Sequence, residues 1–489
     1  MQDQALQDSR LPLQTRVTVG GFLIAGLLAA GIVGLSPSLT LGLVLGALGL
    51  LLFLVKPVET LLTAIVFRVF MDILWWVPFE VAGLNVSQIF SVGVFAMLVL
   101  VVLLKLPRLH EHPGAFWALG SLFMMGIATL RAIDLRTDLD ILFRYPTSPL
   151  MFLATALVFD TPRLRRLLVL LITCSALVPL AWSMFDLITG ASDYVLHGYD
   201  RLLGGYKNIH NHALVMMVFA MLFLTYSGVV KRRALRWGLW GLTGACMVAI
   251  YFTYTRTGML GVALSILAFL LALRQRQLVA LALVGGAFLM VLDPDMQERF
   301  GDLLGLFDTS MDSSERRELG SGRWGLWSWS MNEYLSRPVS DIVIGIGLGG
   351  FRVTTEDWSR AFHRMGLTLD PHNDYLLFLY QMGPMGVITY VGMLWATYKG
   401  ALLVLRHPAD PWARLFAASV IGLCVGVFIT NGVSNSFIHR SAPGWYFWAR
   451  AGVVVGESME VRARLKAAAR EAARPKLISA SPANADPRA

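Results

Sequence analysis

Residues 86–104 read VSQIFSVGVFAMLVLVVLL, a run of 19 residues without a charged side chain. A helix rises about 1.5 Å per residue, so a helix of this length crosses the roughly 30 Å hydrocarbon layer of a bilayer. Inside that layer a helix satisfies its own backbone N–H and C=O groups. The run therefore predicts a transmembrane helix.

Similar runs recur along the chain and predict an all-α polytopic membrane protein. In the whole sequence 56% of residues are apolar and only 15% are charged, which is typical of this class. We expect about 12 to 14 transmembrane helices, several of them short. Their centres lie near residues 16–35, 38–55, 58–78, 86–104, 115–130, 144–160, 166–187, 212–230, 237–255, 258–273, 277–292, 374–396, 412–432 and 443–457.

The basic residues of the short loops indicate the orientation in the membrane. With fourteen spans these loops all fall on one side, and short loops rich in Lys and Arg stay in the cytoplasm. Both termini are then cytoplasmic, and the external face receives the long loop 293–373. The net charge of +9 follows from this topology and from basic blocks that attract anionic membrane lipids, so it does not indicate nucleic acid.

Arg256 differs from the other arginines expected on the external face. It lies in YTRTG, residues 254–258, a turn of a few residues between two apolar spans. Its guanidinium can occupy only the interface or an internal cavity, and a charge there is costly unless it is paired. Two interpretations stay open: an anion-binding residue, and an anchor whose side chain reaches the headgroups.

The external loop contains a predicted amphipathic helix. Apolar residues recur at Trp324, Trp327, Met331 and Tyr334, and Pro338 ends the pattern. Tryptophan and tyrosine suit the headgroup layer. We expect this helix to lie on the membrane with Arg323 in its first turn.

A glycine-rich run, IGIGLGGF at residues 344–351, follows that helix. It superficially suggests a loop that cradles phosphate, but the strand–turn–helix context of a dinucleotide site is missing. Tight turns that present backbone donors are the favoured interpretation.

A titratable imidazole ends the external loop, in DPHNDY at residues 370–375, directly before an apolar helix. His372 is thereby placed where water meets the bilayer. Asp370 and Asp374 beside it either orient the ring or join it around a divalent cation. Orientation is favoured, because a base needs its tautomer to be set by a neighbour.

Two other pairs of polar residues allow more than one interpretation. Arg68 and Asp72 are spaced i, i+4 in an apolar span, so they form either a structural ion pair or part of a proton relay. His210 and His212 stand at the start of another span. Two histidines can bind a metal, but the sequence specifies no third ligand.

In their order and membrane context, several of these elements resemble the O-antigen ligase and Wzy-type polysaccharide polymerase superfamily. The resemblance covers roughly residues 205–396, and Pro384 is a local departure from the family pattern. The matching elements are Lys207-Asn208 to His212, Thr255-Arg256-Thr257-Gly258, Ser321-Gly322-Arg323 with the aromatic helix, the glycine run to Phe351, and His372-Asn373 followed by Gly383 and Gly386.

The resemblance implies a membrane glycosyltransferase of GT-C-like architecture in the bacterial inner membrane, with no metal or other cofactor. The implied donor is an undecaprenyl-diphosphate-linked glycan at the periplasmic face, and the acceptor is lipid A-core or a second lipid-linked glycan. The domain division then runs as N-terminal transmembrane helices (1–204), catalytic region (205–396), C-terminal helices (397–457) and a basic, partly disordered cytoplasmic tail (458–489).

The chemistry of the residues agrees with this implication. Cleavage of a glycosyl–diphosphate bond leaves negative charge on the diphosphate, which arginine forks stabilise; we assign Arg256 and Arg323 to this role. Histidine, with an unperturbed pKa of about 6.5, suits the base that deprotonates the acceptor hydroxyl, so His372 is the candidate. Attack opposite the diphosphate inverts the anomeric centre. The expected substrate-binding residues are Asn373, Asp374, Lys207 and Arg352.

Two functional alternatives stay open at this point. A ligase and a polymerase use the same donor chemistry and differ only in the acceptor. A flippase or other transporter would instead require charges at mid-membrane and paired broken helices from internal repeats. Of the charged residues, only Arg68 and Asp72 are expected to lie deep, which favours glycosyl transfer.

Overall fold

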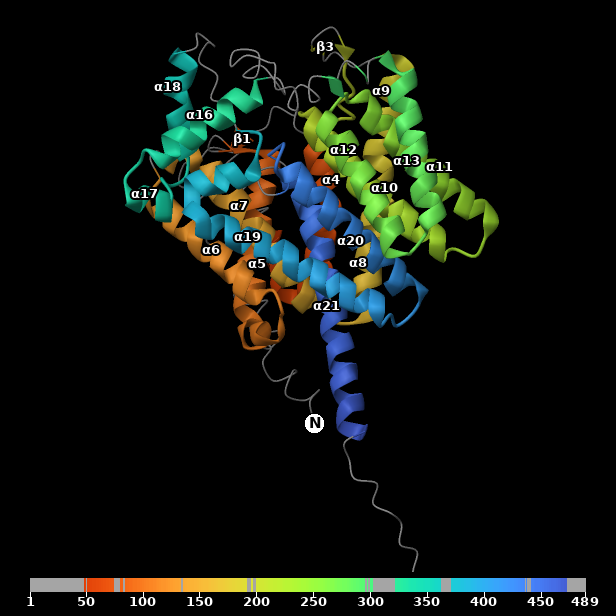
Figure 1. Ribbon diagram of the computed structural model, residues 1–489. Helices are drawn as coiled ribbons and strands as arrows, with labels where there is room; N and C mark the ends of the chain where they lie inside the picture. Colours follow the sequence, from red (N-terminus) through yellow and green to blue (C-terminus); the bar gives the residue numbers. More distant parts are fainter. Residues whose placement is uncertain are drawn as a thin grey trace, which may run out of the picture.

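The computed structural model is a bundle of helices (Figure 1). It describes residues 48–49, 51–73, 80–81, 84–132, 135–190, 195–196, 199–294, 297, 300–301, 322–361, 371–435, 437 and 441–472. The expected span 16–35, most of 38–55, and Asp370 lie outside these residues.

The helices of the first half follow the apolar runs closely, and two of them, α5 and α6, have the predicted bounds. They are α4 (Pro57–Ile73), α5 (Val86–Leu104), the 3₁₀ helix η2 (Leu106–Glu111), α6 (Ala115–Leu130), α7 (Leu135–Val158), α8 (Pro162–Ser175), α9 (Leu177–Thr189), α10 (Ile209–Val229), α11 (Arg233–Phe252), α12 (Arg256–Ala272) and α13 (Arg276–Leu292). The expected span 166–187 is divided into α8 and α9 at Ala176.

The second half holds three short helices of the external loop and three long helices. They are α16 (Arg323–Leu335), α17 (Val339–Ile344), α18 (Gly350–Ala361), α19 (Asp374–Arg406), α20 (Pro411–Asn431) and α21 (Ser441–Ala472). The strands among the described residues form two antiparallel pairs, β1 (Glu80–Val81) with β2 (Leu84–Asn85) and β3 (Val195–Leu196) with β4 (Tyr199–Asp200).

Six helical segments of the described chain are long and apolar enough to cross a membrane, with α8 and α9 taken as one segment. They are Val86–Leu104, Ile141–Val158, Pro162–Thr189, Ile209–Val229, Asp374–Arg406 and Pro411–Asn431. The apolar helices Ala115–Leu130, Arg256–Ala272 and Arg276–Phe288 are shorter. The chain is therefore an all-α polytopic membrane protein, as predicted.

Helices α10, α20 and α21 supply much of the core. Almost every side chain of α10 is buried, and Trp445, Tyr446 and Trp448 of α21 are among the largest fully buried ones. Small residues let α12 approach α20 closely: a Cβ at Gly426 would lie 2.1 Å from Ser265 Oγ. Such contacts replace the hydrophobic driving force that helices lack within lipid.

The deep charged pair is a structural ion pair. Arg68 Nη2 lies 2.6 Å from Asp72 Oδ1. Its Nη1 donates to Ser91 Oγ at 2.8 Å, and its guanidinium stands 4.8 Å from the centre of the Trp445 ring. Arg450, fully buried in α21, donates to the Val218 carbonyl and to Ser419 Oγ. Both arginines tie helices together.

The glycine run docks on a break in α19. Gly383 has φ +65° and interrupts the helix ahead of Pro384, which exposes carbonyl groups there. The Ile346 and Gly347 N–H groups donate to the carbonyls of Tyr380 and Gln381. At Gly345 a Cβ would lie 2.4 Å from the Gln381–Met382 backbone. The run thus forms tight turns with backbone donors, as favoured from the sequence.

Helix α16 begins at Arg323, as expected, and one of its faces is buried. Leu326, Ser330 and Tyr334 are buried, whereas Trp324 is 44% exposed and Met331 is 37% exposed. The buried face packs against α19, where Tyr334 and Tyr380 lie 5.2 Å apart between ring centres. The amphipathic pattern predicted the helix correctly, and the structure adds that Leu326, Ser330 and Tyr334 form the face that packs on the rest of the protein.

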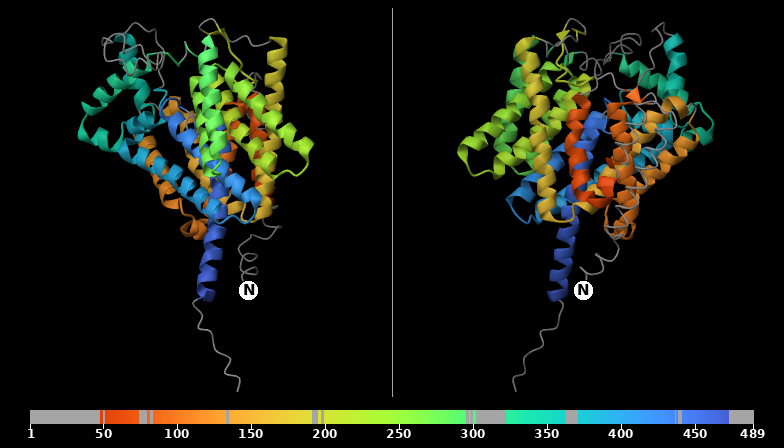
Figure 2. Two further views of the ribbon diagram at one scale, coloured as in Figure 1. Left: turned by 45° about the vertical axis from the view of Figure 1, so that its right-hand side comes forward. Right: turned by 180° about the vertical axis from the view of Figure 1, so that it is seen from behind.

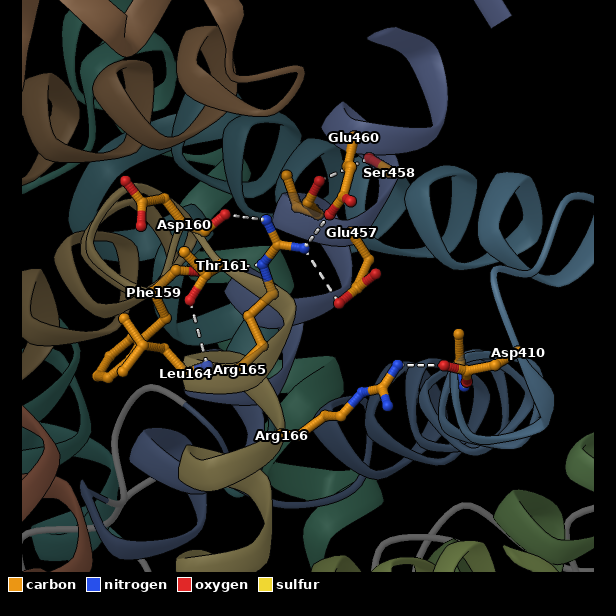
Figure 3. Close-up of polar contacts among 12 residues, drawn as sticks. Phe159, Asp160, Thr161, Leu164, Arg165, Arg166, Asp410, Glu457, Ser458 and Glu460 are labelled. Carbon is orange, nitrogen blue, oxygen red and sulfur yellow. Dashed lines mark hydrogen bonds and ion pairs between the residues drawn. The ribbon is translucent and has the colours of Figure 1, made fainter. Parts of the chain in front are cut away.

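The two ends of the bundle differ. Helices α16, α17 and α18 lie at the same end as β3, while the C-terminal part of α21 projects from the other end (Figures 1 and 2). Near that second end Arg165 joins α8 to α21 (Figure 3): Nη1 lies 3.0 Å from both Glu457 Oε1 and Glu460 Oε2. Its other nitrogens donate to the carbonyls of Phe159 and Asp160.

Candidate functional site

His372 occupies a sharp turn at the entrance to α19. Its φ is +49°, a left-handed conformation that is uncommon in residues other than glycine and that clusters at functional sites. Asn373 next to it caps the helix, since its side chain accepts the Leu376 N–H at 3.0 Å. The cap sets where the helix starts, and hence where the imidazole stands.

Neighbouring elements hold this turn from two sides. The Trp327 indole N–H of α16 donates to the Pro371 carbonyl at 2.6 Å. From the segment after α20, Asn435 Oδ1 accepts the Asn373 backbone N–H at 2.8 Å. The buried Asp374 accepts the Phe437 N–H at 3.3 Å through Oδ2. These contacts compensate for the unusual backbone conformation.

Arg323 is attached to the same support. It opens α16 directly after Gly322, which has φ +78°. Its Nη1 donates to the Val433 carbonyl at 2.7 Å, two residues before Asn435. On α16 it stands one turn before Trp327. Arg323 and the His372 turn are therefore both attached to α16 and to the segment after α20, through Val433 and Asn435.

Arg256 opens α12 from a tight turn in which Tyr254 has φ +51°. Its side chain is partly buried. Gly258 packs against the first turns of α10, since a Cβ on Gly258 would lie 2.7 Å from Ala213 Cβ. One turn further, Gly261 meets Thr430 near the end of α20. Arg256 thus begins a helix that lies between α10 and the helix leading to Val433.

Lys207 and Arg352 lie on other elements. Lys207 is exposed in the segment ahead of α10, beside Asn208, which caps that helix. Arg352 is partly buried on α18, which meets α19 at Tyr380, 5.0 Å from Phe351 between ring centres. Tyr380 follows His372 by about two helical turns. Arg352 is therefore placed further along α19 than the turn at His372.

Two residues of this region, Trp327 and Asn435, received no site role from the sequence, and a third, His210, received a different one. Trp327 was expected to face lipid, yet its N–H holds the histidine turn. Asn435 lies in a short polar loop after an apolar span, and only the folded chain brings it to Asn373. His210 was considered with His212 as a metal pair, but its ring lies 6.1 Å from that of His372.

The two candidate metal histidines separate in the structure. His212 is fully buried, and its Nε2 lies 3.0 Å from Ser183 Oγ on α9. His210 instead faces the α19 turn. Within the part of the chain that the structure describes, no three His, Cys, Asp or Glu side chains are arranged to hold a metal ion.

Comparison with known families gives one match. Residues 239–391 match the family model described as O-antigen ligase. This region is similar to the O-antigen ligase family. The matched region runs from α11 into α19 and contains Arg256, Arg323, Arg352 and His372 to Asp374, while Lys207 and His210 precede it. No curated protein matches the chain.

This match, together with the apolar helices, supports a membrane protein of a glycan-transferring family of ligases and polymerases. The matched region includes the helices that carry the two candidate arginines and the histidine turn. Val433 and Asn435, which bind Arg323 and the histidine turn, lie beyond the matched residues.

Proposed function

We propose that the protein is a glycosyltransferase that moves a glycan from an undecaprenyl-diphosphate carrier to an acceptor hydroxyl at the periplasmic face of the bacterial inner membrane. One observation carries this proposal. The same helix, α16, holds the His372 turn through Trp327 and starts with Arg323. A base and a cation on one rigid support suit a reaction that needs both.

In the proposed mechanism His372 removes the proton from the acceptor hydroxyl. The acceptor oxygen attacks the anomeric carbon from the side opposite the diphosphate, and the configuration inverts. The bond to the phosphate oxygen breaks, and its electron pair stays on the departing diphosphate. Asn373 and Asp374 hold the turn that positions the imidazole.

Arg323 and Arg256 stabilise the charge on the leaving group. A guanidinium has five N–H donors in a planar fork, so Arg323 can hold the Val433 carbonyl with one nitrogen and present others to phosphate. Arg256 stands at the start of α12, where the helix dipole adds partial positive charge. Lys207 and Arg352 are proposed to bind outer parts of the substrates.

The proposed reaction has two forms, which differ in the acceptor. A ligase transfers the glycan to lipid A-core, and a polymerase transfers it to another lipid-linked repeat unit. Transport of the lipid-linked glycan is less well supported, because Arg68 pairs with Asp72 and also donates a hydrogen bond to Ser91. Charges at a transport site would have to meet the moving substrate.

Reconstitution tests the proposal. The purified protein is supplied with an undecaprenyl-diphosphate-linked glycan and, separately, with lipid A-core or excess lipid-linked glycan as acceptor. We expect transfer to one acceptor, and a loss of at least about 100-fold in kcat for His372→Gln, since general-base catalysis contributes about 10² to 10⁴. Full activity of His372→Gln rules out the base. Labelling of Ser336→Cys from the periplasmic side checks the orientation.

A further inference from the structure

His210 is a second imidazole at the turn that carries His372. The two ring centres lie 6.1 Å apart with 44° between the ring planes. An oxygen atom bound to an imidazole nitrogen lies about 2.8 Å from it. Two imidazoles at this separation can therefore each bind one of two neighbouring hydroxyl groups of the same sugar.

The position of His210 is set by rigid structure. It belongs to the first turn of α10, where the Asn208 side chain caps its backbone N–H at 2.8 Å. Two residues later His212 is fully buried against Ser183, and one turn later Ala213 packs on Gly258 of α12. The side chain thus comes from a fixed helix end and not from a mobile loop.

The geometry favours the acceptor over the donor as the ligand of His210. A general base must lie within hydrogen-bonding distance of the hydroxyl that it deprotonates. A sugar whose hydroxyl reaches a nitrogen of His372 therefore brings its neighbouring hydroxyl groups within reach of His210. The diphosphate is bound instead by guanidinium groups on α12 and α16.

We propose that His210 binds the acceptor glycan, through a hydrogen bond to a hydroxyl close to the one that reacts. This inference rests on the proposed function, in which His372 is the base. The acceptor O–H proton goes to His372, the new glycosidic bond forms, and the bond to phosphate breaks with its electrons on the diphosphate. His210 neither gains nor loses a proton in the step.

Kinetics of two variants test this assignment. His210→Leu removes the hydrogen bond, so the acceptor KM is expected to rise about tenfold, the value of roughly one good hydrogen bond. The kcat and the donor KM should change less than about twofold. His210→Gln should keep most of the acceptor affinity, because its amide also forms hydrogen bonds. His110→Leu, at an exposed position of η2, is the matched control.

A merely structural role gives a different result. A packing defect would lower kcat and raise both KM values. The variant His210→Gln would then not restore the acceptor KM. The assignment is overturned if His210→Leu raises only the donor KM, if it leaves the acceptor KM unchanged, or if Gln behaves like Leu.

Equilibrium binding separates this inference from the proposed reaction. Lipid A-core oligosaccharide and the lipid-linked glycan are titrated calorimetrically into His372→Gln and into His210→Leu/His372→Gln, neither of which is expected to turn over. Weaker acceptor binding by the double variant supports His210, and equal binding or no binding of either probe overturns it. Absence of transfer by the unaltered protein contradicts the proposed reaction, while the binding comparison still decides the role of His210.

Discussion

At the residue scale, the candidate site contains residues other than glycine whose backbone conformation is left-handed and therefore unfavourable. His372 and Tyr254 both have positive φ, and each stands next to a helix start. Neighbouring hydrogen bonds to Pro371, Asn373 and Asp374 compensate for this at His372. A side chain held in such a turn has few alternative positions, which is what a reaction with strict geometry requires.

The planar guanidinium of Arg256 is expected to matter more than its charge. Arg256→Lys keeps the charge but loses the bidentate fork, so we expect the KM for the lipid-diphosphate donor to rise at least about tenfold. Steady-state transfer assays with varied donor measure this. Arg276→Lys, at the start of the next helix, is the control, and an unchanged donor KM in Arg256→Lys would remove Arg256 from the diphosphate site.

At the element scale, α16 acts as a clamp on the start of α19. Its buried face packs on α19. The Trp327 indole N–H donates to the Pro371 carbonyl, and Arg323 donates to the Val433 carbonyl. The sequence predicted this helix from its amphipathic pattern. It could not predict which face is buried, because Trp324 and Trp327 are equally apolar and only the position of α19 distinguishes them.

Removing one hydrogen bond of this clamp should slow the reaction without unfolding the protein. Trp327→Phe keeps an aromatic ring but loses the N–H that binds Pro371, so we expect kcat to fall about five- to tenfold. Trp324→Phe, one turn away and 44% exposed, should leave kcat unchanged. Equal kcat values for the two variants would show that the clamp does not position His372.

At the scale of the whole molecule, the site and the Arg165 cluster lie on different parts of the bundle. Arg165 and Glu457 are 4% and 7% exposed, and they tie α8 to α21 (Figure 3). Breaking a buried ion pair from one side is costly because it leaves an uncompensated charge. The cluster therefore contributes to stability and not to chemistry.

Arg165→Met should destabilise the fold by about 3 kcal/mol, since Glu457 stays buried without its partner. The thermal unfolding temperature in detergent measures this. Arg163→Met, at an exposed position on the same helix, should change it little, and Arg165→Met/Glu457→Leu should recover part of the loss. If Arg165→Met and Arg163→Met unfold at the same temperature, the buried ion pair of Arg165 and Glu457 does not stabilise the fold.

The sequence by itself determined the class of the protein and the bounds of many helices, because burial in lipid requires long apolar runs whose ends can be read directly. The extents of α5 and α6 were predicted in this way, and the amphipathic pattern predicted α16 with Arg323 in its first turn. Only the tertiary structure decided which side chains meet. Asn435 with Asn373, Trp327 with Pro371, and His210 with His372 are far apart in the chain, and their contacts depend on how α10, α16, α19 and α20 pack, which local hydropathy does not encode.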